Sequence, residues 1–397
     1  MSQGKKAFLI GLVVVLFAFV AAMQVHLDPL RAKFQPGKVT NIQLGTQFIA
    51  ATLIGLKEVV GGLLWVRTDE FFHEGNYDAI IPMVRIVTWL DPHQMNVYET
   101  GAWHLSYNFT DSQERSDRRY IPASKALLRE GIQNNPRTYD MYFQLGWLNF
   151  NKVLDYAESA KWFKEANIRD AVDPATGRRK TRPQFVGHTL AHAYENSGDV
   201  DAAVRQWQEN IRANEEYARR YAREEGNQVM VDVARNNLAL VLREKETRAK
   251  LTPTYNAKFE AHWERIAPRK FRVWGTINVP NGCRVRLQIA DRGFKEAFFG
   301  SFRWDIDQSQ TILIDDLYVR DGKFNRTIDI ERDSAIYPLK AEEYVATFTL
   351  DPRKTPREAR DVLGWMGSAL ADQPYLVKQG DARILQKEIV LKRSDLL

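Results

Sequence analysis

The sequence contains a single cysteine, Cys283, among 397 residues. One cysteine excludes an intrachain disulfide framework and a zinc site built from cysteines. Enzyme signatures are missing as well: we find no nucleophile elbow, no glycine-rich phosphate loop and no metalloprotease helix motif. We therefore expect a protein that is not an enzyme, with no catalytic residues, no cofactor and no metal.

The chain also lacks a concentration of charge of one sign. Its net charge of +6 is spread along the sequence, whereas a nucleic-acid binder gathers lysine and arginine on one element. We expect no nucleic-acid partner. Aromatic residues are plentiful, with 10 Trp, 15 Tyr and 20 Phe, and this composition predicts folded domains with large cores.

The N-terminus carries a long uncharged apolar segment. Residues 7–23 follow Lys5 and Lys6 and contain no charged residue. With residues 24–27 the segment approaches the roughly 20 residues that cross a bilayer, and its basic flank predicts a cytoplasmic N-terminus. We interpret residues 1–27 as a single-pass anchor that places the rest of the chain on the extracytoplasmic side (periplasmic or outer). A cleaved signal peptide, with a cleavage site at residues 20–22, is the alternative.

A second apolar run covers residues 48–66 and follows a polar linker with two prolines at residues 28–41. Lys57 and Glu58 lie in the middle of this run, where charges would be costly in lipid. A buried helix is therefore favoured. As a second membrane span, the run would return the rest of the chain to the cytoplasm.

Helix pairs then recur along the chain. Residues 61–92 read as two amphipathic helices that are separated by a turn at Gly75 and end at Pro92. Similar pairs follow over residues 95–136, from residue 139, and up to residue 211, with turn residues such as Asp155 and Gly198 at matching offsets. Residues 108–120 form a polar insertion in the second pair, and the third pair has one extra residue at its turn.

This pattern over residues 61–211 resembles the tetratricopeptide repeat (TPR), a helix pair of about 34 residues that stacks with copies of itself. The spacing is longer after the first and third pairs, and Ser124 and Ser159 stand where the family prefers alanine. The resemblance implies an α-solenoid over residues 42–266, which includes capping helices at 212–250 and a further helix at 257–266.

In TPR proteins the first helix of each pair lines a concave ligand surface. The resemblance therefore implies a groove formed by Trp65, Asp69, Glu99, Trp103, Phe143, Trp147, His188 and His192. Tryptophan is enriched at the hot spots of protein interfaces, so a protein or peptide partner is expected there. The alternative is a groove filled from within by residues 212–266 or by the C-terminal domain.

From residue 268 the apolar period changes to the alternation typical of strands. Turn signals at residues 280–282 and 321–323 separate the strands. The pattern predicts an antiparallel β-sandwich over residues 268–397, with a helical insertion near 355–370 and a last strand at 384–391. It resembles the immunoglobulin-like and transthyretin-like domains of bacterial envelope proteins.

Three weaker patterns in the sequence have simpler explanations. His188 and His192 have the i, i+4 spacing of metal-binding helices, but the glutamate of a zincin is absent, so polar groove residues are favoured over metal ligands. The basic residues 178–182 would suit lipid headgroups, although such a short run is more typical of a solvated loop. Four aspartates, Asp305, Asp307, Asp315 and Asp316, offer oxygens for calcium but lack the spacing of a calcium loop, and solvated sandwich edges explain them better.

Together these patterns predict a multidomain chain, α then β, with a transmembrane helix, a TPR-like solenoid and a C-terminal sandwich. We expect a membrane-anchored scaffold that mediates protein–protein interaction in a bacterial cell envelope. The alternative is an envelope carbohydrate-binding protein or an enzyme whose site lies on the sandwich or at the domain junction, because residues 294–304 are rich in aromatics.

Overall fold

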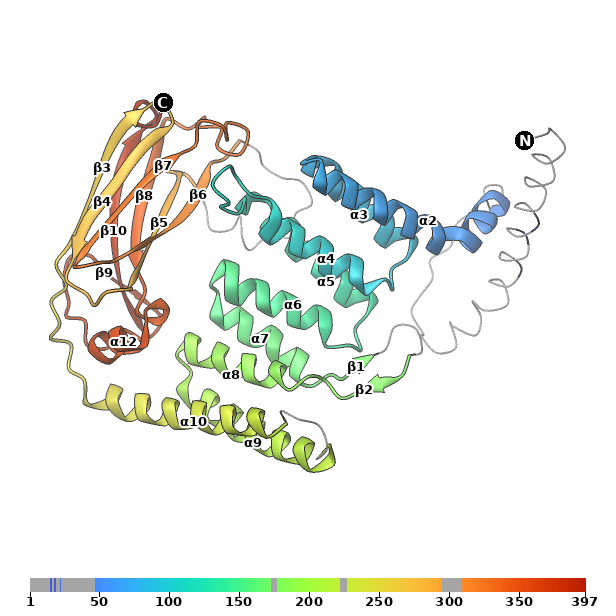
Figure 1. Ribbon diagram of the computed structural model, residues 1–397, viewed down its shortest axis with the longest axis horizontal. Helices are drawn as coiled ribbons and strands as arrows, with labels where there is room; N and C mark the ends of the chain where they lie inside the picture. Colours follow the sequence, from blue (N-terminus) through green and yellow to red (C-terminus); the bar gives the residue numbers. More distant parts are fainter. Residues whose placement is uncertain are drawn as a thin grey trace. The chain divides into compact units, whose positions relative to one another are not determined.

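The computed structural model describes residues 15, 18, 22, 47–172, 177–221, 227–294 and 309–397 (Figure 1). The predicted linker, and the predicted anchor apart from residues 15, 18 and 22, lie outside these residues. No helix in the described part of the chain is long and apolar enough to cross a membrane. The chain divides into two compact units, Met1–Tyr98 and Glu99–Leu397, and each is described by itself.

The first unit contains a helical hairpin. Helix α2 (Gln47–His73) is continuous and joins the second apolar run to the first predicted repeat helix. Gly75, with a φ of 73°, makes the turn, because glycine adopts this left-handed conformation without a steric cost. Helix α3 (Tyr77–Leu90) follows and packs on α2. Its inner face consists of Ile80, Val84 and Val87, which are fully buried as the apolar periodicity predicts.

The second unit begins with a stack of helices. Each of α6 to α10 packs on the helix before it in the chain, so the solenoid of helix pairs is confirmed (Figure 1). The helices are α4 (Met95–Trp103), α5 (Ile121–Asn134), α6 (Asp140–Leu148), α7 (Tyr156–Asn167), α8 (Phe185–Ser197), α9 (Val200–Arg220) and α10 (Asn227–Lys250).

Two of the first helices of these pairs end in a π-helical turn. Helix α4 continues into His104–Asn108, and α6 continues into Asn149–Val153. A π turn accommodates one more residue than an α turn. This explains the extra residue in the third repeat: the helix absorbs it, and Leu154 closes the turn with a φ of 67°.

The two serines that depart from the family pattern are buried and hydrogen-bonded. The Ser124 hydroxyl donates to the carbonyl oxygen of Ala102 at 2.9 Å, and the Ser159 hydroxyl donates to that of Gly146 at 2.9 Å. In each pair the second helix thus bonds to a small residue on the first. The small residue is needed there, since a Cβ on Gly146 would lie 2.6 Å from the ring of Phe163. Serine therefore replaces alanine without an unpaired buried hydroxyl.

Two antiparallel sheets follow and share one hydrophobic core. The strand order is β6-β5-β8-β10-β9 in one sheet and β3-β4-β7 in the other. The strands are β3 (Phe259–Ala267), β4 (Lys270–Ile277), β5 (Arg284–Asp291), β6 (Ile312–Tyr318), β7 (Lys323–Asp329), β8 (Glu343–Leu350), β9 (Leu376–Gln379) and β10 (Ala382–Lys392). The predicted C-terminal antiparallel strands are confirmed, including the last one.

The predicted boundary at residue 268 is wrong. Residues 257–266 were expected to form a helix, but Phe259–Ala267 form strand β3, which pairs with β4. Phe259 and Ala261 face the core while Glu260 and His262 face outward, and this alternation outweighs the helix-forming residues that precede Pro268. The helical insertion is also shorter than predicted, since helix α12 covers only Arg357–Leu363.

Candidate partner-binding surface

The predicted groove residues divide between the two units. Trp65 and Asp69 lie on α2 in the first unit, where Trp65 is half-buried and Asp69 is exposed. The other six residues lie in the second unit, on α4, α6 and α8.

Trp103 on α4 and Trp147 on α6 are the open part of this surface. Their exposed fractions are 52% and 36%, which is high for large apolar side chains. The π turns that follow the two helices contact each other, because the Asn151 amide donates to the Tyr107 hydroxyl at 3.5 Å. Trp103 precedes Tyr107 by one turn, as Trp147 precedes Asn151, so the tryptophans occupy corresponding places on neighbouring helices.

Trp147 belongs to a row of stacked rings on α6 and its π turn. Its indole stacks on Phe143 with centroids 6.2 Å apart and on Phe150 with centroids 6.0 Å apart. Phe163 supports the row from α7, with its ring 5.2 Å from that of Phe143. We call Phe143, Trp147 and Phe150 the aromatic row. Rings held by such packing lose little freedom on binding, which favours affinity.

The predicted groove residues include Phe143 and Trp147 of the aromatic row but not Phe150. Phe150 lies at i+3 from Trp147, and helical spacing alone would have placed both on one face. It also missed Phe185 at the start of α8, whose ring lies 5.0 Å from that of Phe143. Phe185 is exposed as well and extends the apolar surface toward α8.

Glu99 gives the surface an acidic end. Burial, and then the negative charge of Asp140, raise the pKa of the Glu99 carboxyl to about 7. Burial and the charge of Asp140 also raise the pKa of the Tyr139 hydroxyl, and Glu99 adds to this effect. Glu99, in the middle of α4, therefore lies close enough to Tyr139 and Asp140, at the start of α6, to act on them.

His188 is part of the packing of α8 on α9, which corrects its assignment to an open groove. Its side chain is buried, and its Nε2 lies 2.8 Å from the amide nitrogen of Asn214. Its ring meets the indole of Trp207 edge to face at 5.1 Å. Burial, and then the charge of His192, lower the pKa of His188 to about 4, so the imidazole is neutral at pH 7.

His192 is partly exposed, but it also contacts Trp207 and Glu195. Its ring lies 5.0 Å from Trp207, and its Nδ1 is 3.2 Å from a carboxylate oxygen of Glu195. The other oxygen of Glu195 accepts a 2.5 Å hydrogen bond from the Trp207 indole. The described residues contain no group of three or more His, Cys, Asp or Glu side chains placed to hold a metal ion.

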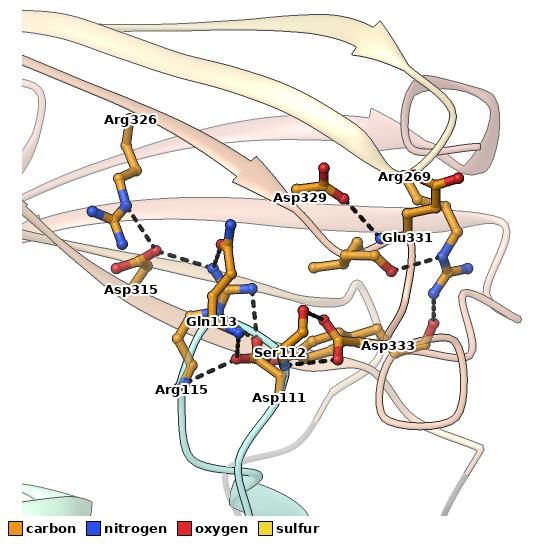
Figure 2. A network of polar contacts seen from close by, with 12 residues as sticks. Asp111, Ser112, Gln113, Arg115, Arg269, Asp315, Arg326, Asp329, Glu331 and Asp333 are labelled. Atoms are coloured by element: carbon orange, nitrogen blue, oxygen red, sulfur yellow. Dashed lines mark hydrogen bonds and ion pairs between the residues drawn. The ribbon is translucent and has the colours of Figure 1, made fainter.

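The insertion in the second helix pair is bound to the sandwich. The Asp111 carboxylate pairs with Arg115 at 2.7 Å and accepts a 2.9 Å hydrogen bond from the Tyr337 hydroxyl. Figure 2 shows Arg115 directed at Asp315, with an Nη1–Oδ2 distance of 3.3 Å, and Ser112 bonded to Asp333, with an Oγ–Oδ2 distance of 2.7 Å. This polar insertion therefore makes an internal contact between the helices and the sandwich of the second unit.

These contacts also correct the reading of the sandwich aspartates. Asp315 was expected at a solvated edge, but it is buried and lies between Arg115 and Arg326, whose Nε is 3.4 Å from its carboxylate. Asp316 pairs with Arg284 at 3.0 Å. Asp305 and Asp307 lie outside the described residues, so calcium binding by this set stays untested.

The sandwich reaches one end of the aromatic row. The ammonium group of Lys354 lies 4.5 Å from the ring centroid of Tyr156 and 5.6 Å from that of Phe150. The Trp365 indole donates to the carbonyl oxygen of Glu195 at 3.0 Å. These contacts involve the C-terminal ends of α6 and α8, and they leave the Trp147 indole partly open to solvent.

The basic residues 178–182 are described by the structure, whereas most of the aromatic segment 294–304 is not. The basic segment is not simply a loop, because Arg179–Lys180 form β2 and pair with β1 (Ala171–Val172) in a short exposed hairpin. The aromatic segment 294–304, on which the carbohydrate-binding alternative rested, lies outside the described residues apart from Phe294.

Comparison with known proteins gives little further support. No family model matches the sequence, and no curated protein matches it. The solved structures with some likeness include two of MamA. One is 15% identical over 49% of this chain and 96% of that chain, with a TM-score of 0.27. The other is 16% identical over 46% of this chain and 96% of that chain, with a TM-score of 0.25. A thermophilic TPR protein of Thermus thermophilus is 16% identical over 48% of this chain and 94% of that chain, with a TM-score of 0.30. Scores this low carry no weight, and the solenoid rests on the helix packing described above.

Proposed function

We propose that this chain is a membrane-anchored scaffold that binds a segment of a partner protein across α4 and α6, with Trp103 and Trp147 as the main contacts. One observation carries this proposal: two tryptophans at corresponding places on neighbouring helices are exposed, at 52% and 36%. A soluble protein rarely leaves large apolar groups in a repeated arrangement unless they meet a partner. Tryptophan is also the residue type that contributes most at interface hot spots.

The aromatic row supports the same function. Phe143 and Phe150 flank Trp147 and hold its ring in a stacked arrangement, so that little side-chain entropy is lost when a partner covers it. An extended peptide or a helix with apolar residues on one face would fit such a strip. The carboxyl of Glu99, in the middle of α4, would select partners by charge when it is ionised.

The anchor and the location are part of the proposal. Residues 1–27 would hold the scaffold in the membrane of a bacterial envelope, with the solenoid and the sandwich on the extracytoplasmic side. Confinement to the membrane would raise the effective concentration of the scaffold near a membrane-bound partner. A phosphatase reporter fused after Lys250 tests the orientation: activity is expected, and an inactive but stable fusion would place the body of the chain in the cytoplasm.

Crosslinking followed by pull-down from membranes tests the binding role. The wild-type chain is compared with the double variant Trp103→Ala, Trp147→Ala and with Trp89→Ala, which removes a tryptophan that is 74% exposed on α3 and is not one of the predicted groove residues. We expect one protein to be lost from the double variant alone. Circular dichroism must first show that the double variant keeps its helix content. Retention of every partner by a folded double variant would refute this binding surface.

A further inference from the structure

One end of the candidate surface carries negative charge. Glu99 on α4 is half-buried, and Asp140 at the start of α6 acts on it as a second carboxylate. Among the described residues, no lysine, arginine or histidine forms an ion pair with either of them. The raised pKa of Glu99 agrees with this, because a neighbouring cation would lower it. A positive charge from a partner can therefore approach this end without displacing one of the protein's own.

The other end carries a positive charge. Lys354 lies in the short turn Pro352–Lys354 of the sandwich, and its ammonium is 5.6 Å from the ring centroid of Phe150. The side chain is half-buried, and no carboxylate in the described part of the chain pairs with it. Burial, and then the positive charge of Arg360, lower the pKa of Lys354 to about 8, as expected of a cation without a counter-charge.

The aromatic row connects these two ends. Asp140, Phe143, Trp147 and Phe150 follow one another at intervals of three, four and three residues along α6 and its π turn. Such intervals place residues on one face of a helix, and the stacked rings of the row show that three of the four share it. The order along this face is therefore a carboxylate, three aromatic rings and the ammonium group of Lys354.

Helix α4 has the same polarity. Glu99 acts on Asp140 at one end, and the Tyr107 hydroxyl accepts a hydrogen bond from the Asn151 amide at the other, where the π turns meet. In the chain, each of the two exposed tryptophans lies between these contacts, after a carboxylate and before a π turn. Both helices thus contribute a carboxylate to the same end of the surface.

We propose that the partner segment carries opposite charges at its two ends: a lysine or arginine that meets Glu99 and Asp140, and an aspartate or glutamate that meets Lys354. Apolar side chains between them would cover the tryptophans. This inference rests on the proposed function and specifies the partner that fits it. The face from Asp140 to Phe150 is about 15 Å long, so about five residues of an extended segment, or about three turns of a helix, would span it.

The physical basis is the state of the two half-buried charges. Each has lost part of its hydration without gaining a counter-charge, so a partner that supplies one recovers part of that cost. Attraction between charges is also stronger in such a place than at a fully hydrated surface. A segment with the two charges exchanged would place like charges together at both ends, which would exclude it.

Selection of random twelve-residue peptides displayed on phage, against the full chain in detergent, tests this proposal. The selection is done at pH 7.5, between the pKa of Glu99 and that of Lys354, where most molecules carry both charges. We expect enriched peptides in which apolar residues separate one basic from one acidic residue. Their binding should be lost in the double variant Trp103→Ala, Trp147→Ala.

Charge reversal at Lys354 assigns the acidic position. Selection on Lys354→Glu should replace the acidic residue of the peptides by a basic one, and wild-type peptides should bind this variant at least tenfold more weakly. Lys354→Gln, which introduces no new charge, should lose the acidic preference without gaining a basic one. Lys323→Glu reverses an exposed lysine on β7 in the other sheet and should select the same peptides as the wild type. Circular dichroism checks that each variant is folded.

The outcomes separate this inference from the proposed function. Peptides that depend on the tryptophans but show no charge preference, or that stay the same on folded Lys354→Glu and Lys354→Gln, would overturn the charged ends and leave the aromatic surface in place. If the tryptophan double variant, correctly folded, retains every enriched peptide, or if no peptide is enriched, the binding surface itself is refuted.

Discussion

The hydroxyl of Tyr337 donates a 2.9 Å hydrogen bond to the buried carboxylate of Asp111, although 226 residues separate the two in the chain. Asp111 lies in the insertion of the second helix pair, and Tyr337 lies in the sandwich. The same carboxylate pairs with Arg115, which reaches Asp315 on β6. The insertion therefore fixes the solenoid of the second unit to its sandwich through a buried polar network, in which each partner depends on the others.

Removal of this hydroxyl tests the role of the insertion. Tyr337→Phe leaves Asp111 with one hydrogen bond fewer in a buried place, and we expect the free energy of unfolding to fall by about 1–2 kcal/mol. Urea unfolding followed by fluorescence measures the change. Tyr318→Phe, at a tyrosine that is 61% exposed on β6, should change stability by less than about 0.5 kcal/mol. Equal effects of the two variants on the free energy of unfolding would show that the Asp111–Tyr337 hydrogen bond does not stabilise the fold.

The packing of the third helix pair depends on the absence of a side chain at Gly146. An added Cβ would lie 2.6 Å from the Phe163 ring, so Gly146→Ala should destabilise the chain by about 1–3 kcal/mol through overpacking. Gly62→Ala is the matched control, because the space around Gly62 in α2 is open to 4 Å. Alanine there should be neutral or slightly stabilising. A thermal melt in which both variants match the wild type would contradict this description of the core.

Glu99 predicts a dependence of stability on pH. Burial, and then Asp140, raise the pKa of its carboxyl to about 7, from about 4.3 in an unfolded chain. Between these values the folded chain holds a proton that the unfolded chain releases, so stability falls as the pH rises through this window. Glu99→Gln stays neutral and avoids the loss. We expect the variant to be more stable than the wild type at pH 8 and similar to it at pH 4.

Urea midpoints at the two pH values measure this difference. Glu264→Gln, at an exposed glutamate on β3, is the control and should leave the pH dependence as in the wild type. If Glu99→Gln shows the same loss between pH 4 and pH 8 as the wild type, burial does not raise the pKa of the Glu99 carboxyl in the folded chain.

The sequence allowed prediction of the elements whose signals are local. Gly75, Gly198 and the apolar periodicity were enough to predict the helix pairs, and alternation was enough to predict most strands. Strand β3 was missed because Glu264, Ala267 and their neighbours favour helix, and the pairing with β4 that overrides them is a tertiary effect. The π turns were missed for a similar reason, since an extra residue can be absorbed by a loop or by a helix.

The candidate surface was predicted only in part. The resemblance to tetratricopeptide repeats placed Trp103, Trp147 and His188 on equivalent faces, but their exposure depends on what packs against each helix. Trp207 and Asn214 of α9 cover His188, whereas the two tryptophans remain open. The contact between Asp111 and Tyr337 could not be predicted, because no local pattern links residues that lie so far apart in sequence.

Site-specific photocrosslinking in cells tests whether Trp103 and Trp147 contact a partner protein. A photoreactive amino acid is placed at position 103, at position 147 and, as a control, at position 168, where Ile168 is 70% exposed at the end of α7. We expect positions 103 and 147 to crosslink to the same segment of one protein, identified by mass spectrometry, and position 168 not to. Adducts of equal yield from all three positions, or none from 103 and 147 in a correctly folded chain, would contradict a binding surface on α4 and α6.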